Sequence, residues 1–370
     1  MPSEFTSILS QRKKVTNKPK IIDIFSGCGG ISQGFYDAGF DPILGIDNDD
    51  ASLKTYANQF GQDTTLKLDL FSDSFLKDLD KKLGKNKKSV DVVVAGPPCQ
   101  GFSLTGPRNF DDPRNKLYLS VFKIVKHYKP KAFLIENVKG MKGLYKGVIL
   151  EEIVNRFKKL GYNVTTPKIL LAAEYGVPQM RERLFIVGLK KEFGEFKFPD
   201  PTKSEKEYIT CSDAIGNLPS RDKDIGIEID SYSVKPISDY QKFMQYNSKT
   251  LYNHVATVHS DLVKSVIKLV PEGKNYKALP KGVGDSRKFN EAWTRYHSKK
   301  PSKTIDTGHR NHFHYKWNRV PTIRENARLQ SFRDDFVFLG TKTQQNKQVG
   351  NAVPPLLAFH LAKQILKFIK

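Results

Sequence analysis

The chain has 370 residues, and its 61 Lys and Arg residues outnumber its 39 Asp and Glu residues, which gives a formal net charge of +22 at pH 7. This length exceeds what one hydrophobic core usually fills and predicts two domains, while the basic excess favours nucleic acid as partner over a generally basic solvated surface. Three scattered cysteines do not form a disulfide framework, and no uninterrupted apolar run of membrane-spanning length is present, so we expect a soluble, cytoplasmic protein that contacts no membrane.

A glycine-rich turn follows the first predicted strand. The strand covers residues 21–25, and Ser26-Gly27-Cys28-Gly29-Gly30 leads from it into a helix that reaches Ala38. Glycines let a ligand approach the bare backbone, and the amino end of a helix offers unpaired N–H groups. The residue at position 32 is Ser, so the spacing departs from the G-x-G-x-x-G of nicotinamide oxidoreductases. Read alone, the loop is equally compatible with a simple tight turn.

Two carboxylates come directly after the next two predicted strands. Asp47 follows the strand at residues 42–46, and Asp69 follows the short strand at residues 65–68. Carboxylates at the carboxyl edge of such a sheet bind ribose hydroxyls, although each could also be a helix cap. Their position beside the glycine turn favours an adenosyl-type ligand.

Another strand, at residues 90–95, delivers a cysteine to the same edge. It ends in Gly96-Pro97-Pro98-Cys99, because proline cannot donate a ladder hydrogen bond. The thiol is therefore expected where α/β proteins bind ligands, with an inert buried cysteine as the alternative. The polar, turn-rich residues 101–116 are expected to form a lid.

Ionisable residues also mark the following strands. Glu136 ends the strand predicted at residues 132–135, and Gln179, Arg181 and Arg183 alternate where a strand at residues 181–189 begins. Two arginines aimed into a site with a glutamate and a thiol suit an electron-rich or anionic substrate. An ordinary surface strand is the alternative for the arginines.

The regular alternation of strands and helices fades near Phe196. We therefore predict a domain formed by residues 1–195 and 342–370, with an apolar last helix packed back on it, and a second domain at residues 196–341. His309, His312 and His314 form one cluster in the second domain. They have no cysteine nearby and no matching carboxylate pattern, so we expect no metal there and favour a polar strand or a DNA contact.

From Ile21 to about Phe359 the chain resembles the DNA cytosine-5 methyltransferases, because six segments occur in that family's order. They are Asp23-Ile24-Phe25-Ser26-Gly27-Cys28-Gly29-Gly30, Gly96-Pro97-Pro98-Cys99-Gln100-Gly101-Phe102-Ser103, Glu136-Asn137-Val138, Gln179-Met180-Arg181-Glu182-Arg183, Arg324-Glu325-Asn326-Ala327-Arg328-Leu329-Gln330-Ser331-Phe332 and Gln348-Val349-Gly350-Asn351-Ala352-Val353-Pro354-Pro355. Two departures are small: Asp47 stands where many members have Glu, and Arg333 stands where Pro is frequent.

The resemblance implies a fold and a cofactor. The expected fold is α/β, a doubly wound, mostly parallel sheet of the Rossmann-like methyltransferase type, with a smaller target recognition domain. The expected cofactor is S-adenosyl-L-methionine, with no metal. The residues implied to surround the cofactor are Phe25, Gly27, Gly29, Asp47, Asp69, Leu70, Pro98, Leu117, Asn351 and Val353.

It also implies catalytic residues. A Cys99 thiolate would add to C6 of cytosine and activate C5 to accept the methyl group, and Arg181 is a candidate to favour the thiolate. Glu136 would hold N3 and the exocyclic amine, and Arg183 the C2 carbonyl. Because C6 cannot be reached inside a duplex, the cytosine must be flipped out.

The expected partner is double-stranded DNA, bound by a monomer, and a cognate restriction endonuclease acting on the same site is left open. An RNA (tRNA) cytosine-5 methyltransferase and a catalytically silent DNA-binding regulator are the alternatives. The recognition sequence cannot be read from the region between about Phe196 and Val320, which matches no motif.

Overall fold

The computed structural model describes residues 4–98, 116–284, 291–308 and 311–370, and the chain divides into two compact units. Unit 1 comprises Met1–Ser7, Ala172–Arg181 and Pro201–Leu356, and unit 2 comprises Ile8–Leu171, Glu182–Asp200 and Leu357–Lys370. Compared with the expected division, residues 1–7, 172–181 and 342–356 lie in unit 1, and residues 196–200 lie in unit 2. The segment that ends at Arg181 contains β8, which pairs with Ser302–Lys303 of unit 1.

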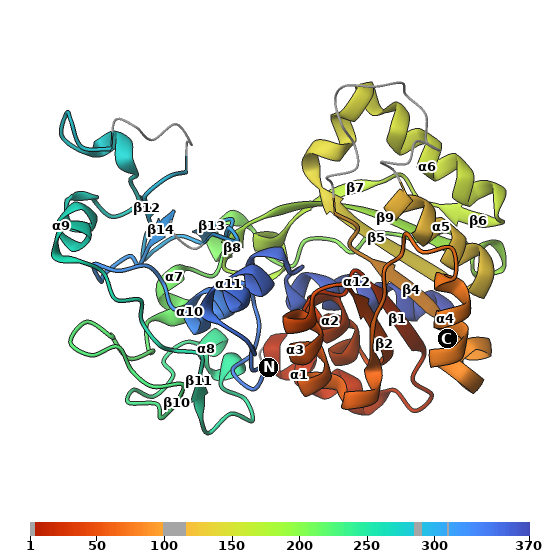
Figure 1. The fold of residues 1–370 in the computed structure, drawn as a ribbon, viewed down its shortest axis with the longest axis horizontal. Helices are drawn as coiled ribbons and strands as arrows, with labels where there is room; N and C mark the ends of the chain where they lie inside the picture. Colours follow the sequence, from red (N-terminus) through yellow and green to blue (C-terminus); the bar gives the residue numbers. More distant parts are fainter. Residues whose placement is uncertain (1–3, 99–115, 285–290, 309–310) are drawn as a thin grey trace. The chain divides into compact units, whose positions relative to one another are not determined.

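Unit 2 is built on an eight-stranded, mostly parallel sheet in the order β3-β2-β1-β4-β5-β9-β6, with β7 also paired to β9 (Figure 1). The first five strands are parallel, whereas β9 is antiparallel to β5, β6 and β7. The strands are β1 (Lys20–Ile24), β2 (Asp41–Asp47), β3 (Thr65–Lys67), β4 (Val92–Ala95), β5 (Ala132–Val138), β6 (Tyr162–Val164), β7 (Lys168–Leu171) and β9 (Glu182–Lys190). The predicted α/β class with a mostly parallel sheet is confirmed.

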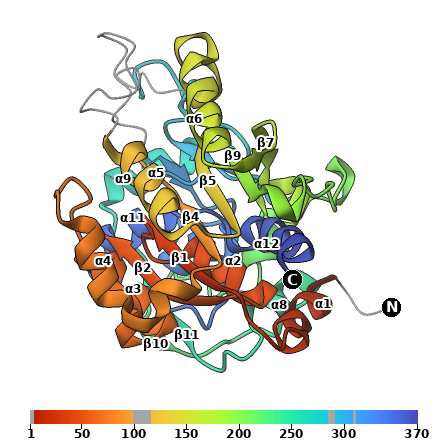
Figure 2. The same cartoon turned by 90° about the vertical axis from the view of Figure 1, so that its right-hand side faces the viewer.

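Helices cover both faces of this sheet, as Figures 1 and 2 show. The face with α4 (Phe75–Leu83), α5 (Lys116–Tyr128) and α6 (Val148–Lys159) contains one continuous apolar core. Leu79, Val121 and Ile153 of these helices are fully buried there, because each helix repeats apolar residues on one side. The other face carries α2 (Gly30–Ala38), α3 (Asp50–Phe60) and α12 (Pro355–Ile369).

The end of the chain, Lys342–Ile369, is long and apolar enough to cross a membrane by length and composition alone. However, 67% of its most apolar window is buried inside the protein. It is also not one continuous helix, because α11 (Lys342–Asn351) and α12 are separated by Ala352, Val353 and Pro354. Burial and the break are typical of core helices of a folded protein.

Unit 1 contains mainly short elements. Its strands form two-stranded sheets only, within the residues that the structure describes. They are β8 (Gln179–Met180) with β13 (Ser302–Lys303), β10 (Ile229–Asp230) with β11 (Leu251–Tyr252), and β12 (Thr294–Arg295) with β14 (His312–Phe313). The helices are α7 (Cys211–Ile215), α8 (Asp239–Met244), α9 (Asp261–Leu269), α10 (Ile323–Leu329) and α11, while α1 (Glu4–Gln11) begins in this unit.

Buried ion pairs around α10 fix the interior of unit 1. Arg319 donates two hydrogen bonds to Glu325, at 2.6 and 2.7 Å, and Arg328 donates two to Asp334, at 2.6 and 2.9 Å. All four side chains are at most 5% exposed. Burial, the largest single cause, would raise the pKa of Glu325, but Arg319 together with His314 and His254 holds that pKa well below its ordinary value. The ionised pair is therefore the stable form.

We predict that Glu325→Gln lowers the free energy of unfolding by about 3 to 5 kcal/mol, because it leaves a buried Arg319 without its counter-charge. Urea unfolding of the whole chain, followed by circular dichroism, measures the loss. Asp239→Asn is the matched control, since Asp239 and Lys242 form an exposed pair worth less than ~1 kcal/mol. Equal, small losses for the two variants would contradict the prediction.

Candidate functional site

The strand order of unit 2 reverses between β1 and β4. The chain runs from β1 outward through β2 and β3, then returns to the other side of β1 with β4 and β5. Open α/β sheets bind ligands at the carboxyl ends of the strands beside such a reversal. The two loops that leave this point are residues 25–29 after β1 and residues 96–98 after β4. The predicted glycine turn and the approach to Cys99 therefore lie next to each other.

The turn after β1 has a backbone that few residue types adopt. Phe25, Gly27 and Gly29 have φ values of 59°, 52° and 99°. A Cβ at Gly29 would lie 2.7 Å from the Phe60 ring, so only glycine fits there, whereas a Cβ at Gly27 would meet no atom within 4 Å. Gly29 precedes the first turn of α2 without a side-chain cap. Open space beside Gly27 therefore lies next to the amino end of α2.

Asp47 ties this turn to the end of β2. One carboxylate oxygen, Oδ2, accepts the Gly27 N–H at 2.8 Å. The other, Oδ1, accepts the N–H groups of Asn48 at 2.7 Å and Asp49 at 2.9 Å. Three backbone donors thus hold a half-buried carboxylate in one orientation beside the glycine turn. The remaining lone pairs of Asp47 can accept hydroxyl groups of a ligand.

A buried polar network that the sequence did not reveal lies behind the turn. The Ser32 hydroxyl donates to Asp23 Oδ2 at 2.7 Å and lies 2.9 Å from the Tyr56 hydroxyl. The Tyr56 ring also fills the space beside Gly45, where a Cβ would lie only 2.6 Å from it. Burial raises the pKa of Asp23 to about 7, against the opposing hydrogen bond from Ser32. An aspartate within the apolar run Ile21-Ile22-Asp23-Ile24 was the available sequence signal.

Glu136 and Arg183 form an ion pair on neighbouring strands, with Glu136 Oε1 and Arg183 Nε 2.9 Å apart. The Glu136 side chain is 12% exposed and the Arg183 side chain 15%. The β5–β9 register places Val138 opposite Arg183, so Arg183 is the diagonal neighbour of Glu136 on the same face. Burial lowers the pKa of Arg183, although Glu136 opposes this shift. Glu136 Oε2 lies 3.5 Å from the position of a Cβ on Gly96. The pair therefore borders the loop that leads to Cys99.

Asn137, which sequence reasoning did not assign, anchors that loop. Its amide donates to the Pro97 carbonyl at 3.0 Å and to the Tyr118 hydroxyl of α5 at 2.8 Å. Asn137 is 3% exposed, so both bonds are made in the interior. Its place directly after Glu136 was the only signal. Successive strand residues point to opposite faces, so Asn137 can hold the loop while Glu136 remains available for a ligand.

The remaining predicted residues of unit 2 have different exposures. Asp69 is exposed and accepts the Phe71 N–H at 2.9 Å, while Leu70 is buried and its carbonyl accepts the Ser120 hydroxyl at 2.8 Å. Leu117 is half-buried, and Pro98 is exposed. Cys99 and residues 101–115 of the expected lid lie outside the described residues.

Three of the predicted site residues belong to unit 1. Arg181 is buried and its Nη2 donates to the Gly350 carbonyl at 3.1 Å. Asn351, at the end of α11, is exposed, and Val353 is buried. Arg181 lies between β8 and β9, so the strand expected to begin at residue 181 begins at Glu182. The strand that carries Arg183 therefore does not include Arg181.

The histidine cluster is internal where it is described. His312 is 5% exposed and His314 is 2% exposed. The His314 Nδ1 accepts the N–H groups of Lys316 at 3.0 Å and Trp317 at 3.1 Å, and burial lowers its pKa to about 3. Among the described residues, which exclude His309, no group of three or more potential metal ligands is found. His314 has the contacts of a neutral, structural histidine.

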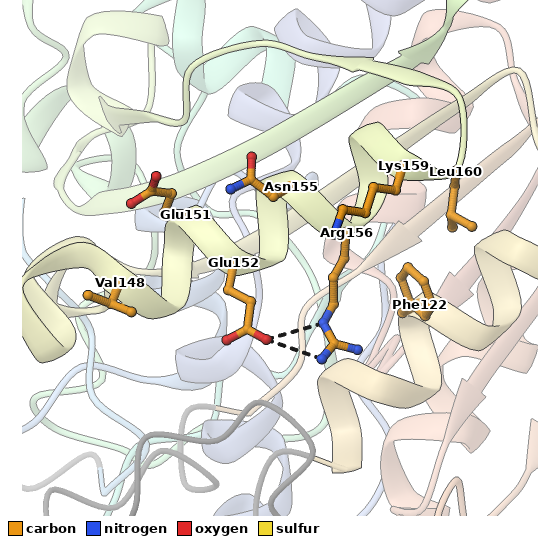
Figure 3. Close-up of a pocket in the computed structure, with 8 residues that line it drawn as sticks. All are labelled: Phe122, Val148, Glu151, Glu152, Asn155, Arg156, Lys159 and Leu160. Carbon is orange, nitrogen blue, oxygen red and sulfur yellow. Dashed lines mark hydrogen bonds and ion pairs between the residues drawn. The ribbon is translucent and has the colours of Figure 1, made fainter.

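A cavity of about 560 Å³ lies elsewhere, on the outer side of α6 (Figure 3). Glu152 and Arg156, one helical turn apart, are bonded across part of it. No predicted site residue lines it. Its lining residues are Phe122, Val148, Glu151, Glu152, Asn155, Arg156, Lys159 and Leu160. We therefore assign the candidate site to the sheet edge.

The strand order and a site at the carboxyl edge place unit 2 among Rossmann-like methyltransferase folds. The profile of the family "C-5 cytosine-specific DNA methylase" matches residues 19–367. The chain is 40% identical to the type II methyltransferase M1.HphI of Haemophilus parahaemolyticus over 94% of this chain and 86% of that protein. It is 36% identical to the type II methyltransferase M.DdeI of Desulfomicrobium norvegicum, over 93% and 88%.

Solved structures agree with this assignment. A DNA modification methyltransferase encoded within an E. coli prophage matches with a TM-score of 0.74 and 26% identity, over 94% of this chain and 99% of that one. The S. pombe Dnmt2 methyltransferase shares the fold, with a TM-score of 0.57 and 16% identity over 95% and 99%. This chain belongs to the C-5 cytosine-specific DNA methylase family. It is a DNA (cytosine-5-)-methyltransferase, of a family that uses S-adenosylmethionine.

We predict that Asp23→Asn gains stability relative to the natural chain as pH rises from about 4 to 7. In that range the unfolded Asp23 is ionised while the folded one keeps its proton, so the stability that Asp23 contributes is lost as pH approaches its folded pKa of about 7. The difference in the free energy of unfolding between Asp23→Asn and the natural chain should change by about 1.4 kcal/mol per pH unit and level off above pH 7. Urea unfolding across this range measures it, and a pH-independent difference would contradict the shifted pKa.

Proposed function

We propose that the chain transfers a methyl group from S-adenosylmethionine to C5 of a cytosine flipped out of a specific DNA sequence, through a covalent bond between Cys99 and C6. The observation that carries this proposal is the Glu136–Arg183 pair, which borders the loop ending at Pro98, directly before Cys99 in the chain. A carboxyl group and a guanidinium side by side suit the edge of a cytosine that presents an amine, a ring nitrogen and a carbonyl in a row.

The residues at the β1 turn fit the proposed cofactor. Gly27 leaves open space, the first N–H groups of α2 have no side-chain cap, and Asp47 presents oriented carboxylate oxygens to a ribose. When bound, S-adenosylmethionine supplies an electrophilic methyl group on a positively charged sulfur. Phe25 and Gly29 would shape the turn around it. Asp69, Leu70, Pro98, Leu117, Asn351 and Val353 remain predicted contacts.

The chain's own residues would activate the base. The Cys99 thiolate would form a bond from Sγ to C6, and the electron pair displaced from the C5–C6 double bond would make C5 a nucleophile. C5 would take the methyl group as the methyl–sulfur bond breaks and leaves its electron pair on sulfur. Loss of the C5 proton to solvent would then re-form the C5–C6 double bond and release Sγ as the thiolate. Glu136 would supply a proton towards N3 as negative charge develops there, while Arg183 holds the carbonyl at C2.

The ion pair sets a condition for this step. Arg183 favours the ionised form of Glu136, so proton donation by Glu136 requires the arriving base to weaken the pair. The C2 carbonyl can do so by accepting a hydrogen bond from Arg183. Base binding and proton donation would thereby be coupled. The expected role of Arg181, to favour the Cys99 thiolate, stays a prediction.

We further propose that residues 196–341 recognise the target sequence and that the chain acts as a monomer on double-stranded DNA in the bacterial cytoplasm. The relatives M1.HphI and M.DdeI carry the name type II methyltransferase. This supports a role in a restriction-modification system, with a restriction endonuclease cutting the same unmethylated site.

We predict that Cys99→Ala lowers transfer of tritiated methyl groups to DNA at least about a thousandfold, since it removes the nucleophile. Cys211→Ala is the matched control, because Cys211 is buried in α7 of unit 1 and should leave transfer within about twofold. Bisulfite sequencing of DNA from cells that express the natural chain should show the modified cytosines and their sequence context. Full activity of Cys99→Ala, or methylation of tRNA without DNA, would overturn the proposal.

We predict that Glu136→Gln and Arg183→Gln each lower kcat at least about a hundredfold. Neither should change the dissociation constant for S-adenosylmethionine by more than about twofold, because the pair joins β5 and β9, whereas the glycine turn follows β1. The double variant should be little worse than either single one, since the two groups act together. Single-turnover kinetics and calorimetry measure these effects, and multiplicative losses would contradict the coupled role.

A further inference from the structure

Lysines gather at the amino ends of the parallel strands of unit 2. Five occur within residues 81–88, where α4 ends and the 3₁₀ helix Gly84–Ser89 leads into β4, and all five are exposed. Lys20, the first residue of β1, joins them in space, because its Nζ donates to Asn86 Oδ1 at 2.9 Å and to Ser89 Oγ at 3.3 Å. We call this group the amino-edge patch; its members are Lys20, Lys81, Lys82, Lys85, Lys87 and Lys88.

Few carboxylates neutralise this patch. Asp80 lies 3.8 Å from Lys87, but it also contacts His127 at 3.0 Å. Asp91, the nearest carboxylate to Lys20, pairs instead with Lys131 at 2.9 Å. Within the described part of the chain, no salt bridge involves Lys81, Lys82, Lys85 or Lys88. The patch therefore presents a concentrated positive charge, of which only Lys87 has a carboxylate partner among the described residues.

The patch and the candidate site lie at opposite edges of the sheet. The site is built from the carboxyl ends of β1, β2, β4 and β5, whereas the patch precedes β1 and β4. At about 3.3 Å per residue, the four residues of β4 alone separate the two edges by about 13 Å. A ligand bound to the patch is therefore distinct from the base that is methylated.

The chemistry of the patch selects duplex nucleic acid over a membrane or a single strand. Membrane-surface helices expose apolar residues beside their lysines, but Phe75, Leu79 and Leu83 of α4 are buried in the core. Single strands are bound by exposed aromatic rings, and no member of the patch is aromatic. Tyr128, nearby, is half-buried and donates its hydroxyl to Asp80 at 3.0 Å. Flexible ammonium groups alone suit a row of phosphates.

We propose that the amino-edge patch binds the phosphate backbone of duplex DNA, independently of sequence, on a segment separate from the one held at the candidate site. Such a contact adds affinity for DNA as a polymer without reading bases. It would keep the enzyme on a long substrate between methylation events, and it does not depend on the proposed catalytic mechanism.

The test is binding to an alternating dA–dT duplex, which contains no cytosine and so cannot fill a cytosine site. The variant carries Lys81→Gln, Lys82→Gln, Lys85→Gln and Lys88→Gln. The matched control makes the same change in charge at four exposed lysines elsewhere in unit 2, through Lys54→Gln, Lys168→Gln, Lys197→Gln and Lys363→Gln. Fluorescence anisotropy at several salt concentrations gives the dissociation constants, and melting temperatures show that each protein is folded.

We expect the patch variant to bind the duplex at least tenfold more weakly at low salt. Its plot of log affinity against log salt should be shallower by about 2 to 4, since each lost phosphate contact removes about 0.9 from the slope. The control should change the slope by less than about 1. A second variant carries only Lys85→Gln and Lys88→Gln, which lie outside α4, and should show about half the effect. Because it leaves the helix unchanged, its weaker binding cannot come from misfolding of α4.

Three results would overturn the proposal. Unchanged affinity and slope in the patch variant would show that the lysines are only solvated. Equal losses in patch variant and control would show that net charge alone matters. Loss of binding to phosphatidylglycerol vesicles, with duplex binding intact, would assign the patch to a membrane surface. Methylation by the patch variant at saturating short DNA should stay within about twofold of the natural chain, which separates this contact from the catalytic site.

Discussion

The antiparallel pairing of β9 with β5 is the constraint on which the candidate site depends. The register sets Val138 opposite Arg183, and only that register makes Arg183 the diagonal neighbour of Glu136 on one face. A slip of one residue would turn Arg183 to the opposite face and leave Glu136 without its cation. Both side chains are largely buried, so without the pairing each charge would stay desolvated and have no opposite charge to offset that cost. The hydrogen bonds between β5 and β9 and the ion pair between Glu136 and Arg183 therefore favour the same register.

The end of β5 performs two tasks with adjacent residues. Glu136 faces Gly96 and Arg183, whereas Asn137 turns to the other face and bonds to Pro97 and Tyr118. The amide thus fixes the last turn of chain before Cys99 without occupying the space beside Glu136. A single strand end consequently carries Glu136 and positions the loop that leads to Cys99, the two residues that we propose act on the base.

The sequence indicated the strands of the parallel sheet and the polar residues at their ends, because these follow from local patterns of two or three residue types. The strand order, with its reversal between β1 and β4, came from the structure. Contacts between distant segments were not predictable in this way. The hydrogen bond from the Gly27 N–H to Asp47 depends on how two loops lie relative to each other. The burial of His312 and His314 depends on the packing of loops, which leaves no periodic pattern in the sequence. Alternation failed at Arg181 because the backbone leaves the strand there, between β8 and β9.

The amino-edge patch and the candidate site lie at opposite edges of the sheet, and the crossover helices run between these edges. Each crossover helix directs its amino end to the carboxyl edge, where Asp47 and Glu136 lie, and its carboxyl end to the amino edge. Lysines in the last turn of a helix complement the negative end of its dipole, and Lys81 and Lys82 occupy that turn of α4. The dipole falls off within one turn, so it does not account for Lys85, Lys87 and Lys88 beyond the helix. Their concentration at the edge away from the site requires a separate cause, and the phosphate backbone of a second DNA segment provides one.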